Sequence, residues 1–214
     1  MRFETVVFDL DGTLLNTLDD LRDSVNFAMR DAGYPERSPA EIRRFVGNGV
    51  RSLVEQSVPE GTDSEKIDAC LAVFRKHYAE NMSNKTGPYE GVMELLQDLQ
   101  ERGVKMGVVS NKYDGAVKEL IAKEFGRFIH VAIGERPGIA RKPAPDSVLE
   151  AMRVLGASPQ STVYVGDSEG DVTTARNAGV AAAACTWGFR DRDVLAALNP
   201  DFIIDSPEEL LRLI

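Results

Sequence analysis

The chain has 214 residues and a formal net charge of −9. This acidic balance argues against nucleic acid or an anionic membrane as a main partner, and no apolar run approaches the roughly 18 residues of a membrane-spanning helix. Cys70 and Cys185 lack the spacing of metal ligands, which predicts free thiols in a reducing cytoplasm. His77 and His130 do not suffice for a zinc site of the usual kind. An anionic substrate would therefore need local positive charge from a metal ion and a few lysines.

The first predicted element is a short apolar strand, Val6–Phe8, which runs into Asp9 and Asp11. In an open parallel sheet, ligands bind outside the carboxyl ends of the strands. Two carboxylates a few ångströms apart repel each other by about 4 kcal/mol at an effective dielectric constant of about 20, so a cation or a shared proton must offset the repulsion. Oxygen ligands alone favour Mg²⁺ over Zn²⁺. A turn capped by one of these acids is the alternative.

A long region without a strand pattern follows, from about residue 15 to residue 88. Ser38-Pro39-Ala40-Glu41 predicts a capping box at the start of one helix, and Thr62-Asp63-Ser64-Glu65 predicts a second capping box. A helical insert of this length is too long for a single crossover. We therefore expect a helical cap domain over residues 15–88 and a core made of residues 1–14 and 89–214.

From residue 90 onward, predicted helices and strands alternate, which is typical of a doubly wound, Rossmann-like α/β fold with a parallel sheet. The predicted strands are 104–109, 129–133, 162–165, 180–184 and 202–204, and the predicted helices are 90–102, 114–124, 146–155, 169–178, about 191–198 and a last one capped by Ser206.

Polar residues suited to phosphate chemistry lie close to the ends of these strands. Ser110 and Asn111 follow the second predicted strand, Lys142 lies in the loop after the third, and Asp167 follows the fourth. Asp171 lies one helical turn beyond Asp167. Because parallel strands end at one edge of a sheet, we expect these residues to converge. Each of them alone has an ordinary explanation, as a turn residue, a solvated lysine or a helix cap.

Four segments of the chain resemble, in order, the four signatures of the haloacid dehalogenase superfamily of phosphohydrolases. The resemblance implies that Asp9 is the nucleophile, which forms an aspartyl-phosphate, and that Asp11 is the general acid and base. The segments are Val6–Leu14, Val108–Lys112, Lys142-Pro143-Ala144-Pro145-Asp146 and Gly166–Asp171.

The resemblance also implies roles for the other residues. Ser110 and Asn111 would bind the phosphate together with Gly12, and Lys142 would neutralise its charge. Mg²⁺ would be held by three aspartates: Asp9, Asp11 through its backbone carbonyl, and Asp167, with Asp171 supporting them from behind. Lys112 matches nothing that the second signature requires, so we expect it at the surface.

Three segments, Phe45–Arg51, Val163–Gly179 and Thr186–Arg190, look like phosphoglycolate phosphatases, a subfamily of this superfamily. Phe45–Arg51 contains Gly47-Asn48-Gly49, whose exposed backbone N–H groups suit a small carboxylate or phosphate, so Asn48 is a candidate substrate contact. An ordinary turn between helices is the alternative. Arg51 meets either a substrate carboxylate or solvent. In Thr186–Arg190, Trp187 either lines the site or simply packs.

The hypothesis is a Mg²⁺-dependent phosphatase of small phosphorylated metabolites, with 2-phosphoglycolate as the first candidate substrate, acting as a monomer or a homodimer in the cytoplasm. A sugar phosphomutase, a pyrophosphatase or a nucleotidase would share the four signatures. A phospho-accepting receiver protein is disfavoured, because residues 130–140 contain no Asp where a receiver carries its acceptor. A binding protein that has lost activity is disfavoured as well, because every catalytic position is filled.

Overall fold

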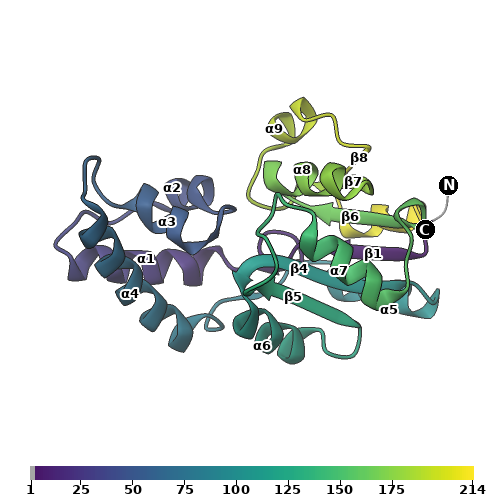
Figure 1. The fold of residues 1–214 in the computed structure, drawn as a ribbon, viewed down its shortest axis with the longest axis horizontal. Helices are drawn as coiled ribbons and strands as arrows, with labels where there is room; N and C mark the ends of the chain where they lie inside the picture. Colours follow the sequence, from purple (N-terminus) through teal and green to yellow (C-terminus); the bar gives the residue numbers. More distant parts are fainter. Residues whose placement is uncertain (1–2) are drawn as a thin grey trace. The chain divides into compact units, whose positions relative to one another are not determined.

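The computed structural model describes residues 3–214, and its central element is the strand β1, Thr5–Phe8. β1 lies inside a six-stranded sheet with the order β5-β4-β1-β6-β7-β8, in which all the neighbouring strands run parallel (Figure 1). The other strands are β4 Lys105–Tyr113, β5 Val131–Glu135, β6 Thr162–Gly166, β7 Ala181–Cys185 and β8 Phe202–Ile204.

Helices cover both faces of this sheet, and alternate residues of β1 point to different faces. Val6 and Phe8 pack in one apolar cluster with residues of α5 and α6, whereas Val7 packs in another with residues of α7 and α8. This confirms the predicted doubly wound sheet, whose strands are apolar on both faces. The helices are α5 Val92–Glu101, α6 Asp114–Glu124, α7 Asp146–Leu155, α8 Glu169–Ala178 and α9 Arg192–Ala197, with 3₁₀ turns at Pro159–Ser161 and Pro207–Arg212.

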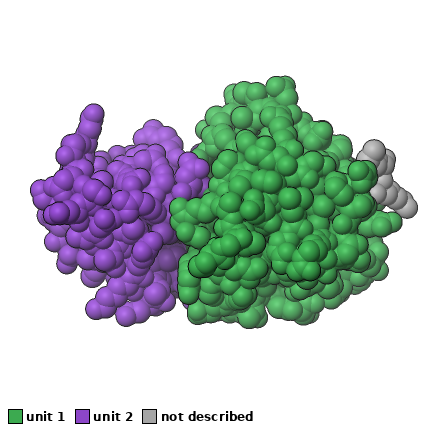
Figure 2. Space-filling model, viewed as in Figure 1, with its two compact units in different colours: residues 1–15, 88–214 green, residues 16–87 purple. Residues whose placement is uncertain are grey.

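The chain divides into two compact units (Figure 2). The first unit comprises the residues up to 15 together with residues 88–214, and it contains the six-stranded sheet. The second unit comprises residues 16–87 and is helical. Its helices are α1 Leu18–Asp31, α2 Pro39–Phe45, α3 Gly49–Ser57 and α4 Ser64–Asn81.

The starts of α2 and α4 test the two predicted capping boxes. At α2 the box forms, because the Ser38 side chain accepts from Glu41 N and the Glu41 carboxylate accepts from Ser38 N. At α4 the prediction was one residue off. The Asp63 side chain caps the helix by accepting from Lys66 N, while the Thr62 hydroxyl donates to Pro59 O in the preceding turn.

Two very short strands pair at the points where the chain passes from one unit to the other. These are β2, Leu15–Asn16, and β3, Gly87–Pro88, although the sequence predicted no strand between residues 15 and 88. Two residues are too few to show the alternation by which strands are recognised.

The strand β4 is longer than predicted, and this matters for the site. It was expected to end at Val109, but it continues to Tyr113, so Ser110 and Asn111 lie within the strand. Its pairing with β5 shifts register between Val109 and Tyr113. Asn and Lys have a low propensity for strands, so the sequence did not predict that β4 continues past Val109. Within residues 3–214, no helix is long and apolar enough to cross a membrane.

Candidate active site

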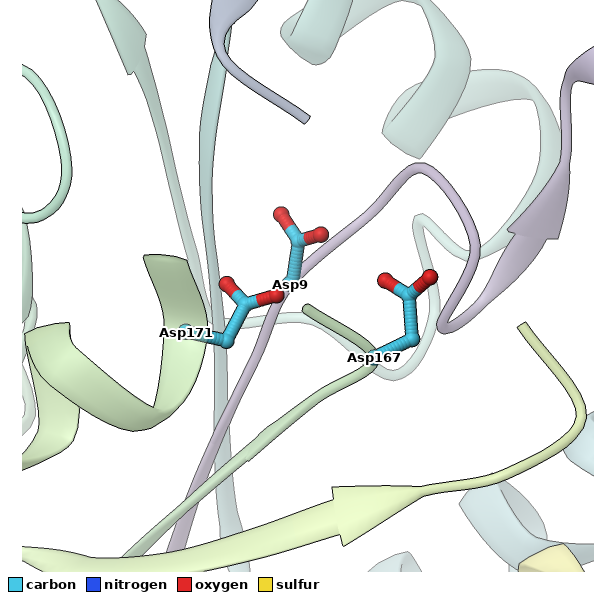
Figure 3. Close-up of side chains that lie close together, drawn as sticks. All are labelled: Asp9, Asp167 and Asp171. Carbon is cyan, nitrogen blue, oxygen red and sulfur yellow. The ribbon is translucent and has the colours of Figure 1, made fainter. Parts of the chain in front are cut away.

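Three carboxylates meet at the carboxyl edge of the sheet. Asp9 directly follows β1, Asp167 directly follows β6, and Asp171 lies in the first turn of α8 (Figure 3). Each offers an oxygen within 4.8 Å of an oxygen of the other two, and all three residues are buried. Because β1 and β6 are neighbouring parallel strands in register, the residues that follow them lie side by side. The predicted convergence of these three residues is therefore present.

The ammonium group of Lys142 lies among these carboxylates. Its Nζ is 2.6 Å from Asp9 Oδ1 and 2.7 Å from Asp171 Oδ1, and it donates to the hydroxyl oxygen of Tyr164 at 3.0 Å. The Tyr164 hydroxyl in turn donates to Asp171 Oδ1 at 2.9 Å. Burial alone would lower the pKa of Lys142, but the charges of Asp171 and Asp9 hold it well above its ordinary value. Lys142 is therefore a fixed positive charge beside Asp9.

The pKa values of the three carboxyl groups shift in different directions. Burial raises the pKa of Asp9 well above its ordinary value, although the charge of Lys142 opposes this shift. Burial, reinforced by the charge of Asp171, raises the pKa of Asp167 to about 7. For Asp171, burial is outweighed by Lys142 and by hydrogen bonds, which lower the pKa. Three carboxyl groups thus share this site with one ammonium, and the raised pKa values of Asp9 and Asp167 show that ionising all three is costly without a further cation.

The cost of ionising these carboxyl groups together and the chemistry of their oxygens fit a divalent cation. The donor set consists of oxygens only, which suits Mg²⁺. Asp171 Oδ2 already accepts from Ser168 N and Ser168 Oγ, and its Oδ1 accepts from Lys142 and Tyr164. Each oxygen of Asp171 thus already accepts two hydrogen bonds, whereas each oxygen of Asp167 and Oδ1 of Asp9 accept one. This difference favours Asp9 and Asp167 as the carboxylates suited to hold the ion.

Two glycines make room around Asp167. Gly12 has a φ of +94°, and a Cβ atom at this position would lie 2.4 Å from Asp167 Oδ2. A Cβ atom on Gly188 would lie 2.3 Å from the backbone oxygen of Gly12. The backbone N–H of Phe189 donates to Asp167 Oδ2 at 2.7 Å. The loops after β1 and β7 thus pack directly on this carboxylate, which requires glycine at both positions.

Trp187 also contributes to this packing. Its indole N–H donates to the backbone oxygen of Thr13 at 2.9 Å, and the residue is half-buried against the apolar core of the first unit. Of the two readings that the sequence left open, the structure shows Trp187 packed against the core and bonded to the loop after β1.

A second group of residues surrounds Asp11. Ser110 Oγ lies 3.5 Å from Asp11 Oδ2 and accepts from Lys112 N at 3.1 Å. Lys112 Nζ lies 3.0 Å from Asp11 Oδ1, and Lys112 is only 7% exposed. The expectation that Lys112 lies at the surface was therefore wrong. Because β4 continues past Val109, Lys112 belongs to a buried strand, and only the length of β4 could have revealed this.

Asn111 has a role that sequence reasoning missed. Its side-chain oxygen accepts from Lys142 N at 2.9 Å, and its side-chain nitrogen donates to Lys142 O at 3.1 Å. These two hydrogen bonds tie β4 to the loop that carries Lys142. Side-chain pairing with a loop 31 residues away leaves no local pattern in the sequence, so the sequence did not predict these hydrogen bonds.

The candidate contacts from the cap segment belong to the second unit. Asn48 immediately precedes α3, and its side chain forms no capping hydrogen bond with that helix. Arg51 is paired with Glu55 at 2.8 Å and with Asp68 at 2.6 Å, and its side chain is 41% exposed. The substrate contact expected of Asn48 stays a prediction.

Known proteins resemble the whole chain. The family described as haloacid dehalogenase-like hydrolases matches residues 6–185. A Pseudomonas aeruginosa protein named phosphoglycolate phosphatase 1 is 34% identical over 212 residues, covering 96% of this chain and 78% of its own. The phosphoglycolate phosphatase of Aquifex aeolicus is 32% identical over 210 residues, covering 97% and 95%.

Solved structures agree with this relationship. A crystal structure from Lactobacillus delbrueckii subsp. bulgaricus has a TM-score of 0.95 at 34% sequence identity and covers 100% of this chain and 99% of its own. The family match spans β1, β4, β5 and β6, and with them the aspartates and Lys142 at their ends. The chain therefore belongs to the haloacid dehalogenase-like hydrolase family.

Proposed function

We propose that this protein is a Mg²⁺-dependent phosphatase that hydrolyses small phosphate monoesters, with 2-phosphoglycolate as the first candidate. The observation that carries the proposal is the position of Asp9, a buried carboxylate at the end of the central strand, 2.6 Å from the ammonium of Lys142. Relatives that match nearly all of this chain are named phosphoglycolate phosphatases, which favours that substrate.

In the proposed mechanism, a carboxylate oxygen of Asp9 attacks phosphorus, and the bond from phosphorus to the leaving oxygen breaks. Asp11 donates a proton to that oxygen, so the alcohol leaves as a neutral molecule. Asp11 then takes a proton from water, and the hydroxide attacks the phosphorus of the aspartyl-phosphate. The phosphorus–oxygen bond to Asp9 breaks, which releases inorganic phosphate and restores the carboxylate.

The remaining residues of the first unit bind and orient the phosphoryl group. The Lys142 ammonium, which Asn111 and Tyr164 hold in place, neutralises charge on the phosphoryl oxygens in the transition state. The Ser110 hydroxyl and the backbone N–H group of Asn111 donate to the same oxygens. The N–H of Gly12 donates to Leu15 O, so Gly12 would serve phosphate binding by letting the backbone approach without a side chain. Mg²⁺, held by Asp9, Asp167 and the backbone carbonyl of Asp11, would draw the phosphate to the carboxylates and offset their repulsion.

The second unit is proposed to act as a cap that selects the substrate. We place the cap at residues 15–88 and the core at 1–14 and 89–214. The helical unit begins at Asn16, shortly after the loop that carries Asp9 and Asp11. This short connection supports the proposal that a movement of the cap affects the catalytic residues. Closure over the site would exclude water, and Asn48 would contact the substrate. The cytoplasmic location and the monomeric or homodimeric state stay predictions of the sequence.

The test is phosphate release from a panel of small phosphate esters that includes 2-phosphoglycolate. Wild type, Asp9→Asn and the exposed control Asp193→Asn are compared with Mg²⁺ and with a chelator. Release should require both Mg²⁺ and Asp9, and the control should match wild type. Full activity of Asp9→Asn would refute the assignment of Asp9 as the nucleophile. A low rank of 2-phosphoglycolate would refute only the substrate, and conversion of a sugar phosphate to its isomer would indicate a phosphomutase.

A further inference from the structure

Lys112 is a buried lysine that the mechanism above does not use. It lies near the end of β4, and its side chain is 5% exposed. An ammonium group removed from water is costly unless a negative charge accompanies it. Its ion-pair partner in the first unit is the carboxylate of Asp11, with 3.0 Å between Lys112 Nζ and Asp11 Oδ1. The fold therefore places a second lysine at the site, separate from the one that faces Asp9.

The hydrogen bonding of Asp11 shows what this pair leaves available. Among residues 3–214, Asp11 Oδ1 is buried and has no hydrogen-bond partner. The Lys112 ammonium, 3.0 Å away, is therefore the charge that compensates this buried oxygen. The other oxygen, Oδ2, has only a long contact of 3.5 Å with Ser110 Oγ. The ion pair with Lys112 thus fixes the direction of the carboxyl group through Oδ1, and Oδ2 is the oxygen left to exchange a proton.

The two lysines are arranged for different carboxylates. Lys142 lies within 2.7 Å of Asp9 and Asp171 and is held by Tyr164, so its ammonium is committed to the three-carboxylate cluster. Lys112 is anchored through β4, and its backbone N–H donates to Ser110 Oγ. A displacement of about 1 Å in a reacting group costs on the order of 100-fold in rate. The short side chain of Asp11 would rotate about χ1 without a partner, and the ion pair with Lys112 restrains it.

We propose that Lys112 is a positioning residue, which holds the Asp11 carboxyl group where it exchanges a proton with the leaving alcohol and then with water. This inference rests on the proposed function, in which Asp11 is the general acid and base. The chemistry assigned to Lys112 is electrostatic, and it forms no bond to the substrate. Its removal should therefore harm most the substrates that depend on proton donation.

The experiment uses three substrates that differ in this dependence. A p-nitrophenolate ion leaves without a proton, whereas the alkoxides of ethyl phosphate and 2-phosphoglycolate require one. We would measure kcat/KM, which reports steps up to release of the alcohol, for wild type, Lys112→Met and Lys112→Arg. The control is Lys123→Met, which removes an exposed lysine of α6.

For Lys112→Met, we expect kcat/KM to fall about 10- to 100-fold for both alkyl phosphates and by less than about threefold for p-nitrophenyl phosphate, because positioned acids contribute factors of this order. Lys112→Arg keeps the charge and should recover part of the loss. Lys123→Met should behave as wild type. Thermal unfolding of each variant shows whether it is folded under the assay conditions.

Each other result overturns the inference. Equal losses for all three substrates would mean that Lys112 only supports the fold. A loss confined to 2-phosphoglycolate would mean that Lys112 binds the substrate carboxylate, and no loss would mean that Asp11 needs no partner. The proposed function fails separately, if wild type hydrolyses none of the esters or if Asp9→Asn keeps its activity.

Discussion

Both units bury polar side chains, but they satisfy them in different ways. In the second unit, Asp20 and Asn26 bond to backbone groups. Asp20 accepts from the N–H groups of Lys85 and Thr86, and Asn26 bonds to both the N–H and the C=O of Arg37. In the first unit, the buried carboxylates of the active site face one another and a lysine.

This difference in hydrogen-bond partners distinguishes buried polar side chains that stabilise the fold from those expected to bind a ligand or take part in catalysis. A carboxylate that accepts from backbone N–H groups completes hydrogen bonds that would otherwise be missing. A buried carboxylate beside other carboxylates raises the free energy of the folded state, and the raised pKa values of Asp9 and Asp167 are the signature of this cost. Such an arrangement is expected where a bound cation or substrate compensates the charge of the carboxylates.

The largest effect should come from Lys142→Met in the first unit. This change leaves Asp9 and Asp171 buried without their ammonium partner. Loss of one partner from a buried ion pair costs about 3–5 kcal/mol. We expect a fall of this order in the free energy of unfolding, together with loss of phosphatase activity. Chemical denaturation with and without Mg²⁺ is the measurement, and an unchanged stability in the absence of Mg²⁺ would contradict the ion-pair argument.

In the second unit, Asp20→Ala should have the next largest effect on stability. It leaves the buried N–H group of Thr86 without an acceptor, and also the N–H group of Lys85, an exposed residue that water can reach. An unsatisfied buried donor costs about 1–3 kcal/mol, so we expect a loss of this order. Asp19→Ala, on the same helix but with a half-exposed side chain, is the matched control. Denaturation midpoints that coincide for the two variants would refute this account.

A smaller effect should appear as pH dependence of the metal-free protein. The pKa of Asp167 rises from 3.8 to about 7 on folding. Between these values the folded state binds more protons than the unfolded state, so stability falls as the pH rises from about 4 towards 7. Asp167→Asn should flatten this fall, and Mg²⁺ should stabilise wild type more at pH 7.5 than at pH 5. Thermal unfolding across this range, in chelator and in Mg²⁺, gives the answer.

The smallest effect should come from Arg51→Gln on the surface of the second unit. Arg51 makes ion pairs with Glu55 and Asp68, and solvent screens such exposed pairs. The melting temperature should not change measurably, and neither should KM for 2-phosphoglycolate. A raised KM at unchanged kcat would instead assign Arg51 to the carboxylate of the substrate, the alternative that the sequence left open.

Much of the site could be predicted, because its residues sit at positions that topology fixes. Asp9 and Asp167 follow apolar strands directly, so predicting the strands also predicted where these carboxylates meet. The position of Asp171 could be predicted because it lies four residues, about one helical turn, beyond Asp167. The catalytic roles of these residues are still proposals, which the variants above test.

The failures share a physical cause. Lys112 and Asn111 act through the end of β4, where polar residues with low strand propensity continue a buried strand. Their partners, Asp11 and Lys142, are distant in sequence, and neither contact has a periodic signal. The short strands β2 and β3 were not predicted for a similar reason, because they are defined by their pairing with each other and not by their amino-acid composition.

The position of β1 inside the sheet has a consequence for synthesis on the ribosome. β1 ends at Phe8, but its neighbours β4 and β6 begin only at Lys105 and Thr162. At about 5–20 residues per second, the interval of about 100 residues before β4 lasts roughly 5–20 s. In that time the helices of residues 16–87, whose contacts are local, can form first. A nascent chain thus exposes the apolar residues of β1 while the insert folds, and we expect chaperones to bind this segment until β4 emerges.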